Sequence, residues 1–305
     1  MTHILTLIAA EPHGLRPNLL ETLATRLRER GARTGEAYWL APDDRACDLP
    51  FEDVAAETAH AVAAATLADL AVDFHAQPVE GRRKKLLIAD MDSTIVTSET
   101  LDELADEAGL KHTIAEITRR TMRGELDFAQ ALVERVAMLA DLPEAALAKT
   151  AAKLTLSPGA ATLVHTMKAN GAFTALVSGG FKYFTSRIAR RADFDLDLAN
   201  DLEVADGRLT GELQGPILDK DGKVNALQTL SAERGLTVAD AVAVGDGAND
   251  LPMLLEAGLG VAYRGKPLLR EAVRCQVNHT DLTALLYFQG YLHEEFVAAD
   301  ERAPA

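Results

Sequence analysis

The chain has 305 residues, of which 48% are hydrophobic and 25% charged, a composition typical of a soluble globular protein long enough for two domains. Its formal net charge of −15 disfavours nucleic acid as a partner, because an acidic protein repels a phosphate backbone. No apolar run in the sequence reaches the ~18 residues that a membrane-spanning helix needs, so we expect no membrane partner either.

The first 80 residues predict a small α+β domain. A strand is expected at 4–10 (ILTLIAA), a helix closed by a glycine at 18–31, and a second strand at 35–42. No basic region precedes the apolar N-terminal stretch, so we interpret it as a strand that begins a domain and not as a signal peptide. Cys47 and Cys275 form no metal-binding or redox motif, which favours reduced thiols in a cytoplasmic protein.

The basic stretch 80–85 (EGRRKK) predicts a boundary, after which a second domain, 81–305, follows. There, short apolar runs that end in polar residues are typical of buried parallel strands, and they alternate with helical segments. This alternation predicts an α/β fold, with a parallel sheet and helices on both of its faces. The expected strands are 86–89, 173–177, 241–244 and 258–262, and the expected helices are 159–170, 182–192, 223–234 and 250–257.

The stretch from about 98 to 150 interrupts this rhythm because it is almost wholly helical, as in ETLDELADEAGL and LDFAQALVERVAMLADL. An all-helical insertion after the first strand is expected to lie over the carboxyl ends of the strands. Ligands bind at those ends in open α/β sheets. We therefore predict a helical cap over the binding site.

Two aspartates, Asp90 and Asp92, follow directly after the first strand of the second domain. Two carboxylates this close are costly to place at the end of a buried strand unless a cation lies between them. A carboxylate can attack phosphorus, and the second one can protonate the leaving oxygen and then activate water. The alternative is a structural role, because Asp and the following Ser93-Thr94 are also common helix N-caps.

Polar residues also follow two further strands. Ser178-Gly179-Gly180 offers a hydroxyl and backbone N–H groups at the start of a helix, which suits an anion, although SGG is also an ordinary turn. The segment 245–250 (GDGAND) supplies acidic oxygens of the kind that Mg²⁺ prefers, and a flexible Gly/Asp loop is the alternative. Lys223, at the start of a helix, is either a phosphate ligand or a surface lysine.

In this order, the elements DMDST, Ser-Gly, Lys and GDGAND resemble the haloacid dehalogenase (HAD) superfamily over roughly residues 86–285. The resemblance implies a Rossmann-like core with a small helical cap, and a phosphatase that forms an aspartyl-phosphate with Mg²⁺ as its cofactor. The ion-pumping ATPases of the superfamily carry threonine where this chain has Asp92. The aspartate therefore implies a hydrolase that discharges its own phosphoenzyme. The N-terminal domain matches the ACT-like regulatory domains of longer bacterial members only loosely.

More narrowly, the chain resembles the phosphoserine phosphatase family. Where that family has a glutamate after its first motif, this chain has Glu99. Where the family's cap supplies a methionine, a phenylalanine and an arginine, this chain has Met122, Phe128 and Arg135. The arginine suits a bidentate pair with a carboxylate, the glutamate accepts from an ammonium group, and the two apolar side chains exclude water. The alternative is that these residues form a helix core and a solvated face.

The resemblance assigns a role to each residue of the predicted site. It implies Asp90 as the nucleophile and Asp92 as the general acid/base. It implies Mg²⁺ held by the Asp90 side chain, the Asp92 carbonyl and Asp246, with Asp250 in support. The substrate-binding residues that it implies are Glu99, Met122, Phe128, Arg135, Ser178, Gly179, Gly180, Lys223 and Asn249.

The resemblance also implies a reaction, the hydrolysis of O-phospho-L-serine to L-serine and phosphate, which is the last step of L-serine biosynthesis. This phosphomonoester is the expected small-molecule partner, and a homodimer is a candidate assembly. Another small phosphomonoester, such as phosphohomoserine or a phosphorylated sugar, is the alternative within the class. A phosphotransferase or a catalytically silent phospho-ligand sensor is the alternative outside it, although a pure binder has no need of both strand-end carboxylates.

Overall fold

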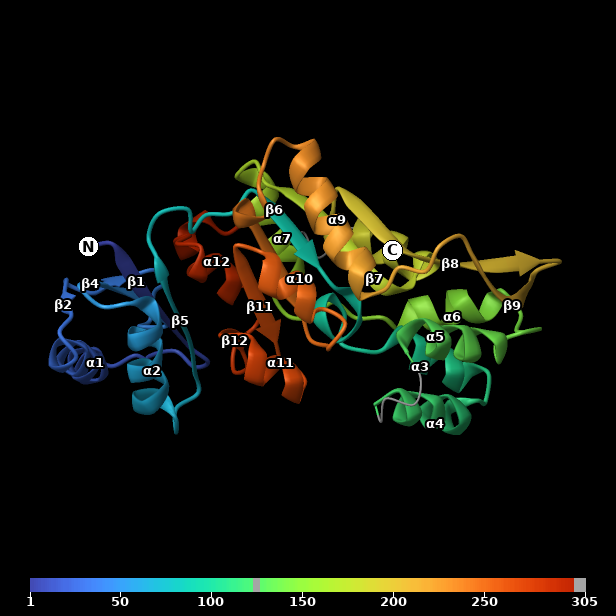
Figure 1. Cartoon of the computed structure of the whole chain (residues 1–305), viewed down its shortest axis with the longest axis horizontal. Helices are drawn as coiled ribbons and strands as arrows, with labels where there is room; N and C mark the ends of the chain where they lie inside the picture. The colour runs from blue at the N-terminus through green and yellow to red at the C-terminus, as the bar shows by residue number, and fades with distance from the viewer. Residues whose placement is uncertain (123–126, 299–305) are drawn as a thin grey trace.

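The structure is a computed structural model that describes residues 1–122 and 127–298. An antiparallel sheet near the N-terminus and a mainly parallel sheet in the centre organise the chain, and a group of helices lies on the side away from the first sheet (Figure 1). None of the helices in the described ranges is long and apolar enough to cross a membrane.

The N-terminal sheet and its helices follow in the chain order β1 (His3–Ala9), α1 (Pro17–Glu29), β2 (Arg33–Thr34), β3 (Tyr38–Trp39), β4 (Ala46–Glu52), α2 (Ala56–Leu67) and β5 (Val72–Pro78). The strand order is β2-β4-β1-β5, with β3 paired to β4, and β1 pairs antiparallel with both of its neighbours. Both helices pack on the sheet face that carries Leu5 and Leu7, and form a separate core with it. Counting the two short strands β2 and β3, which both pair with β4, as one edge strand gives the βαββαβ order of the ferredoxin-like arrangement.

The predicted first strand and first helix are confirmed, but the predicted strand at 35–42 is confirmed only at Tyr38 and Trp39. Only Tyr38 and Trp39 pair with β4 there. The chain then turns back, because the backbone N–H groups of Leu40 and Ala41 both donate to the carbonyl of Ala46. Most residues of this segment therefore lie in a loop.

The central sheet has seven strands in the order β12-β11-β10-β6-β7-β8-β9. Its pairs are parallel except for the hairpin of β8 and β9. The first of these strands in the sequence, β6, lies in the middle of the sheet between β10 and β7. The strands are β6 (Leu86–Ala89), β7 (Phe173–Phe181), β8 (Leu196–Ala205), β9 (Arg208–Gln214), β10 (Ala241–Gly245), β11 (Leu259–Tyr263) and β12 (Cys275–Val277).

Helices cover both faces of the central sheet, as predicted. One face carries α9 (Lys220–Glu233), α10 (Leu251–Glu256) and α11 (Pro267–Ala272), whose leucines pack on Leu86, Ile88 and Val177. The other face carries α7 (Ala160–Ala169), α8 (Lys182–Ala192) and α12 (Ala284–Phe288), in the same core as Leu87 and Leu176. Consecutive strand residues therefore point to opposite cores, which explains why these strands are apolar without interruption.

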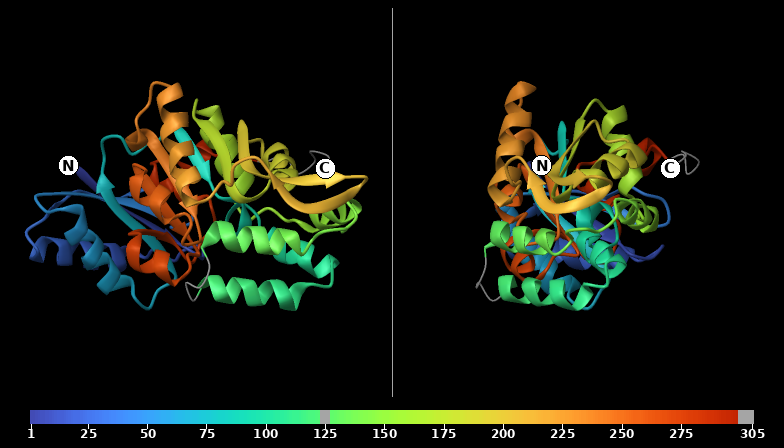
Figure 2. Two further views of the ribbon diagram at one scale, coloured as in Figure 1. Left: turned by 45° about the vertical axis from the view of Figure 1, so that its right-hand side comes forward. Right: turned by 90° about the vertical axis from the view of Figure 1, so that its right-hand side faces the viewer.

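The helical insertion consists of α3 (Thr100–Glu107), α4 (Lys111–Met122), α5 (Phe128–Ala137) and α6 (Ala145–Lys153), close to the predicted 98–150. The β8–β9 hairpin lies along these helices (Figure 2), and the backbone N–H of Asp141 donates to the carbonyl of Leu209. The chain enters and leaves the insertion side by side, because Val96 pairs with Leu156. The cap is therefore joined to the core by two adjacent segments.

Candidate active site

The carboxyl ends of β6, β7 and β10 bring the polar motifs of the sequence to one cavity of about 120 Å³ between the core and the cap. Lys223 and Asp250 lie just behind its wall, where both are fully buried. The side chain of Met122 lies outside the described part of the structure. The predicted residues that line the cavity are Asp90, Asp92, Glu99, Phe128, Arg135, Ser178, Gly179, Gly180, Asp246 and Asn249.

Asp90 ends β6 and is held in place by a buried cation. The Nζ atom of Lys223 donates to Asp90 Oδ1 at 2.6 Å and to Asp250 Oδ1 at 2.5 Å. Burial raises the pKa of Asp90, with help from the Asp250 carboxylate, while Lys223 opposes the rise. Burial alone would lower the pKa of Lys223, but the carboxylates of Asp250 and Asp90 outweigh it and raise this pKa. Lys223 therefore stays charged and favours an ionised Asp90.

Asp92 lies two residues further along the loop, which Ser93 bends with a left-handed φ of 54°. The backbone N–H of Thr100 donates to Asp92 Oδ1 at 3.1 Å, and the Thr100 hydroxyl donates to Oδ2 at 3.2 Å. Burial, and then the nearby charge of Glu99, raise the pKa of Asp92 to about 7, although both Thr100 hydrogen bonds lower it. A carboxyl group with this pKa can both give and take a proton near neutral pH.

The last residues of β7, where its pairing with β8 is irregular, place Ser178, Gly179 and Gly180 beside Asp92. The backbone N–H of Gly180 donates to the Ser178 hydroxyl oxygen at 2.9 Å. A Cβ atom on Gly179 would lie 2.8 Å from the ring of Phe128 in the cap. A Cβ atom on Gly180 would lie 2.9 Å from a carboxylate oxygen of Asp92. Glycine is therefore required at both positions if backbone, cap and carboxylate are to meet here.

Three carboxylates form a cluster at the floor of the site. Oxygen atoms of Asp90, Asp246 and Asp250 lie within 4.8 Å of one another. Burial raises the pKa of Asp246 to about 6, while the Lys266 ammonium group works in the opposite direction. Asp250 Oδ2 accepts from the backbone N–H groups of Asp246 and Gly247, at 3.1 and 2.9 Å. The oxygens of Asp250 thus have protein donors, whereas Asp90 and Asp246 face the cavity.

The cap contributes Glu99, Phe128 and Arg135 to the wall that faces these carboxylates. Arg135 is partly buried on α5, and its Nε atom donates to the carbonyl of Ala131 at 3.0 Å. Burial lowers the pKa of Arg135, and the charges of Asp102 and Glu99 oppose this shift. The remaining guanidinium nitrogens lie beside an acidic residue in a half-closed site, where they suit a carboxylate ligand.

Lys266 is a site residue that the sequence did not reveal. It follows β11, lines the cavity, and lies 3.2 Å from Glu99 Oε1 and 3.1 Å from Asp246 Oδ2. The signal was present, because Arg264-Gly265-Lys266 is a polar segment at the carboxyl end of a fourth parallel strand. Applying the strand-end argument to every strand would have found it.

The comparisons with known proteins cover the core and most of the chain. The family model for haloacid dehalogenase-like hydrolases matches residues 87–255. The phosphoserine phosphatase of Streptomyces coelicolor is 38% identical over 301 residues, which are 98% of this chain and 73% of that protein. The phosphoserine phosphatase of Streptococcus thermophilus is 47% identical over 199 residues, 65% of this chain and 93% of that protein.

The same similarity holds for the fold. The crystal structure of a HAD family hydrolase from Salmonella enterica serovar Typhi matches with a TM-score of 0.82 and 31% identity, over 94% of this chain and 99% of that one. This match includes the N-terminal sheet as well as the core, since it covers nearly the whole chain. The chain belongs to the haloacid dehalogenase-like hydrolases, in their phosphoserine phosphatase branch.

Proposed function

We propose that this protein hydrolyses O-phospho-L-serine to L-serine and inorganic phosphate through a covalent phosphate ester of Asp90. The observation that carries the proposal is that Asp90 and Asp92 share one cavity with Glu99 and Arg135. The first pair supplies a nucleophile and a proton donor. The second pair supplies opposite charges that match the ammonium and carboxylate groups of a zwitterionic substrate. The two relatives named above as phosphoserine phosphatases support the same substrate.

In the first step, an ionised Asp90 oxygen attacks phosphorus, and the bond between phosphorus and the serine oxygen breaks. The carboxyl group of Asp92 gives its proton to that oxygen, so L-serine leaves as a neutral alcohol. Lys223 favours the ionised form of Asp90, against the effect of burial, and orients its carboxylate from behind. The Ser178 hydroxyl and the backbone N–H of Gly179 donate to the phosphate oxygens, while the N–H of Gly180 holds the Ser178 oxygen in place.

In the second step, the Asp92 carboxylate takes a proton from water, whose oxygen attacks phosphorus. The bond between phosphorus and the Asp90 oxygen breaks, phosphate leaves, and Asp90 and Asp92 return to their starting states. The pKa of about 7 that burial gives Asp92 suits both directions of proton transfer. The threonine hydrogen bonds keep its oxygens directed at the cavity.

The residues at the floor of the site fit Mg²⁺. The pKa values of Asp90 and Asp246 are raised even though Lys223 and Lys266 contact these carboxylates, so a further cation would be favourable, and hard oxygen ligands are those that Mg²⁺ prefers. We propose Asp90, the carbonyl of Asp92 and Asp246 as its ligands, with Asp250 as the residue that orients Lys223 and the Asp246 backbone. A bound Mg²⁺ supplies charge neutralisation for the phosphate oxygens.

We further propose that residues 1–80 and 81–305 are separate domains, and that the first is ACT-like. Each part has its own sheet and a core of its own, and the βαββαβ order of the first supports the assignment. The proposed regulatory role of this domain rests on the resemblance alone.

Phosphate release from a panel of monoesters tests the substrate. We expect O-phospho-L-serine to be turned over with a kcat/KM at least tenfold above that of phosphohomoserine and of phosphorylated sugars, and only when Mg²⁺ is present. Preference for a sugar phosphate would overturn the substrate assignment and leave the chemistry at Asp90 intact. L-serine without free phosphate, together with a phosphorylated added alcohol, would indicate a phosphotransferase.

A further inference from the structure

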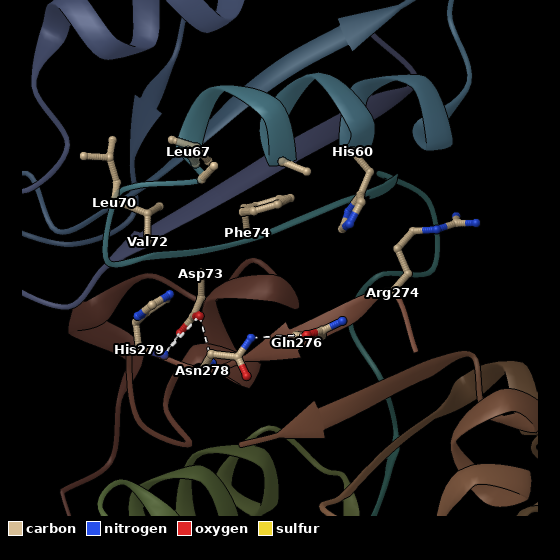
Figure 3. Close-up of a pocket in the computed structure, with 12 residues that line it drawn as sticks. His60, Leu67, Leu70, Val72, Asp73, Phe74, Arg274, Gln276, Asn278 and His279 are labelled. Atoms are coloured by element: carbon tan, nitrogen blue, oxygen red, sulfur yellow. Dashed lines mark hydrogen bonds between the residues drawn. The ribbon is translucent and has the colours of Figure 1, made fainter. Parts of the chain in front are cut away.

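Some buried polar side chains of this protein join segments that are far apart in the sequence, and Asp73 is one of them. It accepts hydrogen bonds from the backbone N–H groups of residues 278–280 at 2.8–3.2 Å (Figure 3). These bonds tie β5 to the loop that follows β12, beside a cavity of about 270 Å³ that no step of the proposed reaction uses. Asn200 on β8 also joins distant segments, but those segments belong to the active site.

Asn200 lies where the pairing of β7 with β8 becomes irregular. The register shifts between Val177 and Phe181, and Phe181 pairs with Asn200. The Asn200 side chain is only 3% exposed, and its Nδ2 atom donates to the carbonyls of Gly179 at 2.9 Å and of Leu218 at 3.3 Å. Its Oδ1 atom accepts from the backbone N–H of Leu218 at 2.6 Å. The buried amide therefore uses both of its N–H groups and its oxygen.

The hydrogen bond to Gly179 fixes the segment 178–180, which faces the phosphate position. The peptide group between Gly179 and Gly180 has its carbonyl held by Asn200 and its N–H held by the Ser178 oxygen at 2.9 Å. Because a peptide group is planar, the two bonds together set its orientation. The Ser178 oxygen acts as the acceptor in this arrangement, so the hydroxyl keeps its one proton for an acceptor in the cavity.

The hydrogen bonds to Leu218 fix the start of α9. Leu218 directly precedes Asp219, whose side chain caps this helix. Lys223 follows at the end of the first turn, where its backbone N–H donates to the Asp219 carbonyl at 3.0 Å and its Nζ atom donates to Asp90 at 2.6 Å. An apolar side chain in place of Asn200 would leave buried backbone groups of both segments without these partners.

We propose that Asn200 is a positioning residue for the phosphate group. It holds the segment 178–180 and the start of α9 at a fixed separation, so that the donors of 178–180 stay aligned with Lys223. Donors held in place stabilise the charge of a transition state more than donors that must first reorganise. The role in the reaction rests on the proposed function, whereas the role in holding a phosphate-like anion does not depend on which monoester is the substrate.

Asn200→Ala in the full chain tests the proposal. We expect kcat/KM to fall about 10- to 100-fold, with most of the loss in kcat, because the donors are loosened and not removed. The loss should agree within threefold for phosphoserine and phosphoethanolamine, since both substrates carry the same phosphate group. Gln289→Ala is the matched control. It removes a buried amide that binds Lys84 and Leu285 outside the active-site cavity, and should change kcat/KM less than twofold.

Calorimetry with orthovanadate and Mg²⁺ tests the same role without a substrate, because vanadate adopts the five-coordinate geometry of the phosphorus under attack. We expect the Kd of vanadate to rise at least tenfold in Asn200→Ala and less than threefold in Gln289→Ala. A wild type that binds vanadate but does not hydrolyse phosphoserine would refute the proposed function and leave this comparison intact. A wild type that binds no vanadate would overturn both.

Asn200→Thr is the second variant, to be measured in the same way if alanine prevents folding. Threonine suits a strand, and its hydroxyl is too short to reach both Gly179 and Leu218. Unchanged kcat/KM in a folded variant, a loss confined to phosphoserine, or an equal loss in Gln289→Ala would overturn the proposal. Failure of both Asn200 variants to fold would assign this residue to the fold alone and would overturn it as well.

Discussion

The Nζ atom of Lys266 lies 3.2 Å from Oε1 of Glu99, so a cation of the protein already occupies the position at which the substrate ammonium group is proposed to bind. The same Nζ atom lies 3.1 Å from Oδ2 of Asp246. We therefore infer an exchange in which the substrate ammonium group displaces Lys266 from Glu99 while Lys266 keeps its contact with Asp246. Lys266 would then be a positioning residue that competes with the substrate for Glu99.

Lys266→Met removes this competitor. We expect the ratio of kcat/KM for phosphoserine to that for 3-phosphooxypropanoate, which lacks the ammonium group, to rise about two- to fivefold, because a partly exposed ion pair contributes little more. Lys266→Arg should keep the original ratio. A ratio that falls in Lys266→Met would show that Lys266 supports the binding of the ammonium group and does not compete with it.

Arg135→Gln tests the proposed recognition of the substrate carboxylate. We expect kcat/KM for phosphoserine to fall about 10- to 100-fold, since a charge-assisted hydrogen bond is lost, and kcat/KM for phosphoethanolamine, which has no carboxylate, to change less than threefold. Arg187→Gln on α8 is the control, because its guanidinium stacks on Tyr183 outside the cavity. Equal losses for both substrates would assign Arg135 to cap folding.

The parallel sheet and its strand ends could be predicted because burial on both faces leaves an unmistakable apolar run, as at Leu86–Ala89. The β8–β9 hairpin could also have been found. Asp206-Gly207 forms its two-residue turn with φ values of 51° and 72°, and this pair is the strongest local signal of such a turn. It was missed because the flanking residues are mostly polar and half exposed.

The arrangement of the active site could likewise be predicted only in part from the sequence. Asp90 and Asp246 follow strands, so their proximity could be predicted, but the contact of Lys223 with both Asp90 and Asp250 joins residues that are far apart in the sequence. No periodicity encodes such a contact, and the family resemblance placed Lys223 only among the substrate-binding residues. Neither the sequence pattern nor the family resemblance predicted the hydrogen bonds between Asp73 and residues 278–280, or the cavity beside them. Both depend on how the N-terminal sheet packs against β12.

Asp73→Ala tests the junction between β5 and the loop that follows β12. It leaves the backbone N–H groups of residues 278–280 without their acceptor, at a cost of about 1–3 kcal/mol for each that stays buried. We expect faster hydrogen exchange in residues 275–283 and a kcat for phosphoserine that changes less than twofold. Asp69→Ala, at an exposed position of the same region, is the control. Unchanged exchange in Asp73→Ala would refute the role of this carboxylate.

Two histidines of the N-terminal part, His60 on α2 and His75 on β5, make the stability of the fold depend on pH. Burial lowers the pKa of His75 to about 3 and that of His60 to about 4, while in the unfolded chain both titrate near 6.5. Their contribution to stability is therefore complete above about pH 6.5 and is lost as the pH falls from there towards 4 and then 3. Asp92 and Asp246, whose pKa values are raised to about 7 and about 6, act in the opposite direction over this range, so the effect of the histidines is measured as a difference between wild type and a histidine variant.

The urea midpoint of His75→Gln, measured relative to that of wild type, should rise as the pH falls from 7.5 to 5, because one of the two histidines no longer titrates. The midpoint of His112→Gln, at an exposed histidine of α4, should keep the same difference from wild type at both pH values. A difference between His75→Gln and wild type that is equal at pH 7.5 and pH 5 would mean that His75 does not contribute to the acid sensitivity of the fold.

Chemical trapping of the covalent phosphate on Asp90 tests the proposed mechanism. Enzyme quenched in acid during turnover of phosphoserine with Mg²⁺ is treated with borohydride, which reduces an aspartyl-phosphate to homoserine, and the modified residue is located by peptide mass spectrometry. We predict homoserine at position 90 in the wild type and in Asp92→Asn, where the intermediate should accumulate, and none in Asp90→Asn. Homoserine at another aspartate, or full phosphatase activity in Asp90→Asn, would contradict the mechanism.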